Sequence, residues 1–176
     1  MLNSEDERLT ALRDAIRRTF PEVTYTGKVT RHDGMWLPEL TEENAIHDDD
    51  MFLYKGLIGK KWTEVPKQLL HDFPDGFVLL TDEALVAFLA AWLMRSLDDI
   101  DGENSVREYF VYSFSREASS TADLKISRLR ALTPGQRSSV RSLLAEFAQR
   151  EPSEFIREHA ATAVQMLDSL PPSLGQ

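Results

Sequence analysis

The chain has 176 residues, of which 42% are hydrophobic and 28% are charged, and this predicts one globular domain and excludes a disordered chain. It contains no cysteine, so disulfides, thiolate nucleophiles, cysteine-ligated zinc and iron–sulfur clusters are excluded. The formal net charge of −9 argues against a nucleic-acid partner, which needs a concentrated basic surface. The same charge favours a protein partner with a basic surface.

The first predicted helix covers residues 4–20. Ser4 and Glu7 have the spacing of a capping box, and Pro21 ends the helix. One face of this helix carries Leu9, Leu12, Ile16 and Phe20. Residues 23–29 then alternate in polarity, which is typical of a short strand or an extended loop.

Two further helices are expected before the middle of the chain. The second begins after Thr41 and ends near Gly56 and Gly59. Its inward side chains are Ile46, Phe52 and Leu53 or Leu57. The third runs from a Thr63 cap to Leu70, with Pro66 in its first turn, and the turn at residues 74–76 ends it.

A central helix over residues 82–97 is the clearest feature of the sequence. Thr81 is placed to cap it, and Asp82 and Glu83 suit its positive end. The helix is apolar on every face and carries Phe88 and Trp92 on one of them, which predicts that it is buried. Its apolar run of eleven residues, 84–94, is shorter than the roughly 18 needed to cross a bilayer, so no membrane association is expected.

Residues 106–114 are rich in aromatic and β-branched side chains, and residues 124–127 could return beside them as a partner strand. Thr133, Pro134 and Gln136 then predict the capped start of another helix. Its inward residues are Val140, Leu143, Leu144 and Phe147. A last helix over about 152–170 is expected to pack Phe155, Ile156, Ala160, Ala163, Val164 and Leu167 inward.

These elements predict a mainly α fold with about six helices around the central helix, and they leave open a small β-hairpin. No internal repeat or change of composition divides the chain, so residues 1–176 are expected to form a single domain with frayed ends near 1–4 and 171–176. The acidic N-terminus lacks the basic and then apolar order of a secretory signal, so a cytoplasmic location is expected.

Four segments together resemble a family of small uncharacterised bacterial proteins that is catalogued as a domain of unknown function. They are residues 11–21, 59–65, 80–84 and 130–136, the last leading into Val140 and Leu143. The resemblance covers roughly residues 10–148 and leaves out the last helix. It departs from the family at residues 86–91, where a Tyr-Tyr-Leu-Pro element is absent. The resemblance carries no established activity, and it implies an accessory or immunity component of a toxin system.

Catalytic motifs are missing from the sequence, because it has neither a Gly-x-Ser-x-Gly elbow nor a phosphate-binding loop. The four histidines lie in four different predicted elements. His47 with residues 48–50 offers an imidazole and carboxylates to a divalent metal, and His71 or Asp75 could join them. The alternative function is therefore a metal-dependent enzyme. The favoured interpretation is a solvated acidic segment, with no metal, no cofactor and no catalytic residue.

A partner-binding site is predicted beside Trp36, a loop tryptophan that precedes an acidic run from Glu39 to Asp50. We expect the acidic side chains to steer a basic partner and Trp36 to anchor it. The predicted binding residues are Trp36, Glu42, Glu43, Asp48, Asp49 and Asp50. The favoured function is thus a non-catalytic cytoplasmic protein-binding module, such as an immunity or inhibitor protein for a basic bacterial toxin or effector. The sequence makes no prediction of an oligomeric state.

Overall fold

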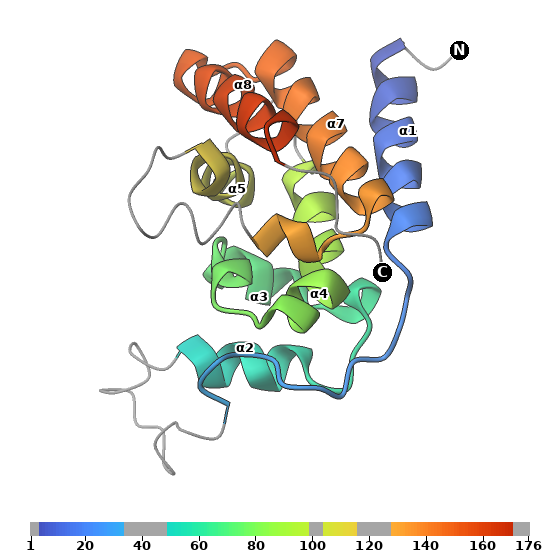
Figure 1. Ribbon diagram of the computed structural model, residues 1–176, viewed down its shortest axis with the longest axis vertical. Coiled ribbons are helices and arrows are strands. Elements are labelled where there is room, and N and C mark those ends of the chain that lie inside the picture. Colours follow the sequence, from blue (N-terminus) through green and yellow to red (C-terminus); the bar gives the residue numbers. More distant parts are fainter. Residues whose placement is uncertain (1–3, 34–48, 99–103, 116–127, 171–176) are drawn as a thin grey trace.

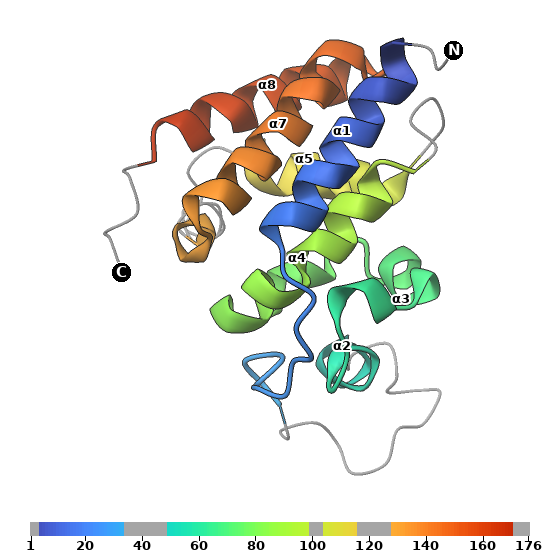
Figure 2. The same ribbon diagram turned by 90° about the vertical axis from the view of Figure 1, so that its right-hand side faces the viewer.

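A computed structural model describes residues 4–33, 49–98, 104–115 and 128–170 (Figures 1 and 2). Over these ranges the chain forms seven α-helices and no strand, which confirms the predicted mainly α fold. The helices are α1 (Ser4–Thr19), α2 (Asp49–Leu57), α3 (Lys67–Asp72), α4 (Asp82–Ser96), α5 (Ser105–Ser115), α7 (Pro134–Arg150) and α8 (Glu154–Asp168). Short 3₁₀ turns lie at Trp62–Glu64, Gly76–Val78 and Leu129–Ala131. None of the described helices is both long enough and apolar enough to span a membrane.

The helix α4 lies at the centre of the fold, as predicted. In both views it passes between α1 and α7 on one side and α2 and α3 on the other (Figures 1 and 2). It also packs against α5 and against all three 3₁₀ turns. Phe88 and Trp92 are completely buried, which confirms that this helix forms the core. Around it, α7 packs between α1 and α8, and α8 packs on α5.

The start of α4 is held by two distant segments. The hydroxyl of Thr81 accepts a hydrogen bond from the Ala84 amide at 3.2 Å, so the predicted cap is confirmed. Residues 23–29 form an extended loop, and next to it a single antiparallel bridge pairs Thr30 with Leu80. The buried Arg128 donates through Nε to the Asp82 carboxylate at 2.7 Å. Its other nitrogens donate to the carbonyls of Val78 and Leu80. One guanidinium thus binds the first residue of the helix and two carbonyls of the segment that precedes it.

The predicted start of the third helix, at a Thr63 cap, is wrong. Thr63 lies in the 3₁₀ turn Trp62–Glu64, and α3 begins only after Pro66. The residue before a proline is disfavoured in the helical region, and Val65 is accordingly extended, with ψ of 124°. Trp62 is buried, and its Nε1 donates to the Phe20 carbonyl at 3.0 Å. The 3₁₀ turn therefore places this indole in the core.

The second predicted helix is described only from Asp49 onward, so its expected start after Thr41 lies outside the described residues. Leu53 and Leu57 are buried, as predicted. Phe52, which was expected to point inward, is on the exposed side of α2 and stacks on Phe73 with 6.1 Å between ring centroids. Residues one position apart on a helix differ by about 100°, and in α2 this rotation turns Phe52 toward solvent while Leu53 points inward.

The strand that the composition of residues 106–114 left open is not observed, because these residues form the helix α5. Asn104 caps it by accepting from the Arg107 amide at 3.2 Å. Phe110 and Phe114 lie four residues apart on its inner face, and both rings lie 5.8 Å from that of Phe77. Packing at helical spacing has thus outweighed the β propensity of the individual residues. Residues 124–127, the expected partner strand, lie outside the described residues.

The capping box at the start of α7 is confirmed. The Thr133 hydroxyl accepts from the Gln136 amide at 3.2 Å, and the Gln136 side chain accepts from the Thr133 amide at 2.9 Å. We predict that Thr133→Ala lowers the free energy of unfolding by about 1 kcal/mol, because one amide of the first turn loses its acceptor. Urea unfolding of the variant, with Thr133→Ser as the control that keeps the hydroxyl, measures this. Equal stability of the alanine variant and the wild type would contradict it.

Candidate protein-binding groove between α5 and α8

A shallow groove of about 300 Å³ lies where α5 and α8 meet at the surface. Its described lining residues are Glu108, Tyr109 and Tyr112 from α5 and Ser153, Phe155 and Ile156 from the start of α8. Two large aromatic side chains are unusually exposed here: Phe155 keeps 56% of its surface accessible and Tyr109 keeps 47%. The groove therefore presents aromatic rings to solvent.

The helical positions of these residues explain why their rings point outward. On α5 the inner face packs Phe110 and Phe114 into the core, which leaves Tyr109 and Tyr112 on the outside. On α8 Ile156 is buried, so its neighbour Phe155 turns away from the core. The expectation that Phe155 packs inward is therefore wrong, whereas Ile156, Ala160, Ala163 and Leu167 are buried as predicted.

His159 joins the aromatic rings of the two helices. Its ring centroid lies 4.1 Å from that of Phe155 and 5.7 Å from that of Tyr112, both in edge-on arrangements. Such contacts add to the stability of an aromatic cluster beyond the area that they bury. The aromatic side chains of α8 and α5 thus form one cluster, linked through His159.

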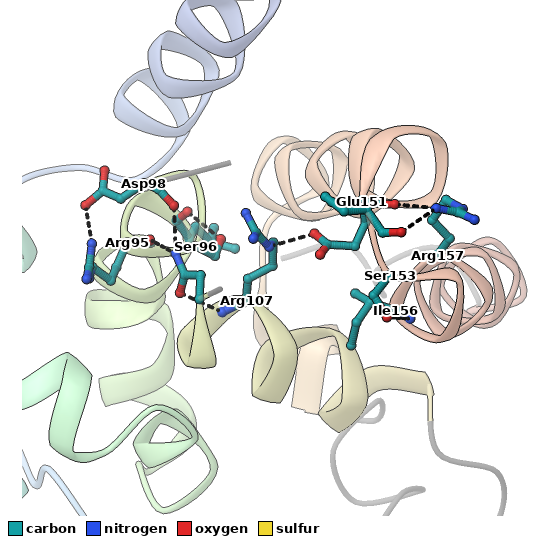
Figure 3. Close-up of polar contacts among 11 residues, drawn as sticks. Arg95, Ser96, Asp98, Arg107, Glu151, Ser153, Ile156 and Arg157 are labelled. Carbon is teal, nitrogen blue, oxygen red and sulfur yellow. Dashed lines mark hydrogen bonds and ion pairs between the residues drawn. The ribbon is translucent and has the colours of Figure 1, made fainter. Parts of the chain in front are cut away.

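A buried ion pair joins the two segments that carry the groove residues. Arg107, on the inner face of α5, extends toward Glu151 in the short connection between α7 and α8 (Figure 3). Its Nε lies 2.7 Å from Glu151 Oε2, at ion-pair distance but without the angles of a hydrogen bond. The side chains are only 1% and 7% exposed. The guanidinium carbon also lies 5.8 Å from the centre of the Phe147 ring.

Burial raises the pKa of Glu151 above the ordinary glutamate value, and the Arg107 charge only partly offsets this. The nearby Glu108 carboxylate raises the same pKa further. The charged form of Glu151 is thus less favourable in the folded protein than in water, although Arg107 lies beside it. The pair links α5 to the end of α7. It thereby helps to orient α5 with Glu108 and Tyr109 on its exposed face.

Hydrogen bonds from side chains to backbone carbonyls anchor the start of α5 and the turn before α8. Arg157 donates to the carbonyls of Glu151 at 2.6 Å and Pro152 at 3.0 Å (Figure 3). At the other end, the Asn104 amide donates to the carbonyls of Arg95 at 3.0 Å and Asp98 at 2.8 Å. Side-chain hydrogen bonds to these carbonyls tie α5 to the end of α4 and fix the turn before α8. The groove therefore has well-anchored walls.

Most of the binding residues that the sequence predicted fall outside the described part of the chain. Trp36, Glu42, Glu43 and Asp48 lie outside the described residues, as does His47 of the metal alternative. Asp49 and Asp50 lie in the first turn of α2, and the two views place α2 at the opposite end of the molecule from α8 (Figures 1 and 2). They are therefore not part of the groove.

The metal alternative gains no support from the residues that the structure describes. His71 is exposed and contacts the neighbouring Asp72 carboxylate at 3.2 Å. Within 4–33, 49–98, 104–115 and 128–170, no group of three or more histidine, aspartate and glutamate side chains could hold a metal ion. A site that includes His47 stays a prediction.

The sequence matches the model of a family of unknown function, DUF6714, over residues 8–167. The chain belongs to this family. Searches of curated proteins and of solved structures gave no match. The matched region extends past residue 148, where the resemblance noted from the sequence ended, and includes most of α8. Both walls of the groove therefore lie within the part that defines this DUF6714 domain.

Proposed function

We propose that this DUF6714 protein is a non-catalytic protein-binding module that recognises a partner with a basic surface through the groove between α5 and α8. The observation that carries the proposal is the exposure of Tyr109 and Phe155 on a groove next to the buried Arg107–Glu151 ion pair, which joins α5 to the connection before α8. Adjoining exposed aromatic side chains are a feature of interaction sites, because aromatic residues contribute most of the binding energy at many interfaces.

The fixed walls favour binding for a second reason. A surface that is already in its bound shape loses little conformational entropy when a partner docks. Arg107 and Asn104 hold α5 in place through buried contacts, and Arg157 holds the turn before α8. Tyr109 and Phe155 are thus presented on elements whose positions do not depend on the partner.

The charge of the chain supports a basic partner. The formal net charge is −9, and Glu108 is the charged side chain among the described residues that line the groove. Complementary charge speeds association and suppresses unsuitable partners. An immunity or inhibitor protein that acts in the cytoplasm on a basic toxin is the specific form of this proposal, and there Asp49 and Asp50 on α2 would add to long-range attraction.

Affinity capture with matched baits tests the proposal. The baits are the wild type, Phe155→Ser and the control Val23→Ser, which alters a side chain that is 60% exposed in the extended loop after α1. We expect the wild type and Val23→Ser to capture the same protein from native cells, and Phe155→Ser to bind it at least about tenfold more weakly. Binding of the purified partner should weaken as the salt concentration rises.

Circular dichroism must first show that all three baits are folded, which is expected because both substituted side chains are at the surface. Capture of the same partner with equal affinity by Phe155→Ser would contradict the proposal. So would a partner whose binding strengthens with salt, because the attraction of an acidic chain for a basic surface is screened by ions.

A further inference from the structure

Resting on the proposed function, we infer that the groove between α5 and α8 binds a lysine or arginine side chain of the partner, held over the aromatic rings and paired with Glu108. Three observations carry this inference: the charge of the groove, the chemistry of its rings and its size.

The charged side chain that lines the groove among the described residues is the acidic Glu108. Glu108 is exposed and takes part in no ion pair among the described residues. The neighbouring base, Arg107, faces the interior and is paired there with Glu151. A cation entering the groove would therefore meet a carboxylate that forms no ion pair with the described residues.

The aromatic rings favour the same ligand. The face of a tyrosine or phenylalanine ring carries partial negative charge and attracts a cation within about 6 Å. Tyr109, Tyr112 and Phe155 supply three aromatic rings to the groove that Glu108 also lines. Aromatic faces and carboxylates each attract ammonium and guanidinium groups.

The size of the groove favours a side chain of a protein over a free metabolite. Its volume of about 300 Å³ is at the lower limit of sites for small molecules, which enclose most of their ligand. Lysine and arginine have an apolar stem and a charged end. The stem can pack on Phe155 and Ile156 while the charged end reaches Glu108, so the groove matches both parts of one basic side chain.

Titration with model compounds, followed by NMR of the aromatic rings, tests this inference without the partner. The probes are Nα-acetyl-lysine N-methylamide, the arginine equivalent, the uncharged norleucine equivalent and tetramethylammonium. We expect the lysine or the arginine probe to bind in the millimolar range, to shift the ring signals of Tyr109, Tyr112 and Phe155, and to bind at least about threefold more tightly than norleucine.

Two glutamate-to-glutamine variants, each removing one negative charge, test which carboxylate binds the probe. Glu108→Gln should weaken binding of the charged probes about threefold, whereas Glu7→Gln, on the exposed side of α1, should leave it unchanged. Equal binding of the norleucine and charged probes would overturn the inference, and so would equal affinities of Glu108→Gln and the wild type. Binding of tetramethylammonium alone would also overturn it and would indicate a site for small cations.

These outcomes are separable from those of the capture experiment. If Phe155→Ser loses the partner while the charged probes show no preference, the groove binds a protein but not through a basic side chain. If Phe155→Ser keeps the partner, the proposed function fails whatever the probes do.

Discussion

Replacing Trp92 by alanine is expected to lower the free energy of unfolding by about 3–5 kcal/mol, because it leaves a large cavity in the middle of the core. The Trp92 side chain is fully buried on α4, and its ring contacts that of Phe77 edge-on at 6.1 Å. Its Nε1 donates to the Phe73 carbonyl at 3.1 Å, which joins α4 to the end of α3. Urea unfolding followed by circular dichroism measures the change.

Two companion variants show whether the loss of stability comes from the buried ring. Trp92→Phe keeps an aromatic ring but not the indole N–H, so it should cost less than the alanine substitution. Tyr109→Ala removes an exposed ring of α5 and should change stability by no more than about 0.5 kcal/mol. If Trp92→Ala were as mild as Tyr109→Ala, α4 would not be the centre of the core.

Replacing Arg107 by methionine is expected to lower the free energy of unfolding by about 3–5 kcal/mol at neutral pH, because the buried Glu151 carboxylate then loses its counter-charge. The matched control is Arg141→Met, which breaks an exposed pair with Asp168 at 2.6 Å. This control should have little effect, because solvent already screens both of its charges. Urea unfolding of both variants makes the comparison.

The effect of Arg107→Met should depend on pH. Without Arg107, the pKa of Glu151 in the folded state rises further above its value in the unfolded state, where the side chain is hydrated. The folded state then binds the proton more tightly than the unfolded state does. The destabilisation is therefore fully present above the folded pKa and is progressively lost as the pH falls through it. A difference from wild type that grows on acidification would contradict this account.

Short-range signals made the caps of α4 and α7 predictable. Thr81 and Thr133 each accept from an amide three residues later, and this spacing is readable in the sequence alone. The apolar run of α4 likewise identifies its burial without any knowledge of its neighbours. These features depend on residues within one turn or one helix, so sequence analysis reaches them directly.

The features that form the candidate site depend on contacts between distant residues. Arg107 and Glu151 are far apart in the sequence, and neither has a local pattern that marks it as buried. The β propensity of residues 106–114 concealed the helix α5, whose inward spacing of Phe110 and Phe114 was the signal that could have revealed it. Read as a helix, the same segment places Tyr109 and Tyr112 on its outer face.

The most direct test of the central claim is amide hydrogen exchange of the chain with and without its captured partner. The account predicts that the partner slows exchange mainly in α5 and in the first half of α8, around the groove residues Tyr109 and Phe155. Slowed exchange confined to other segments, such as α1 or α2, with α5 and α8 unchanged, would contradict it.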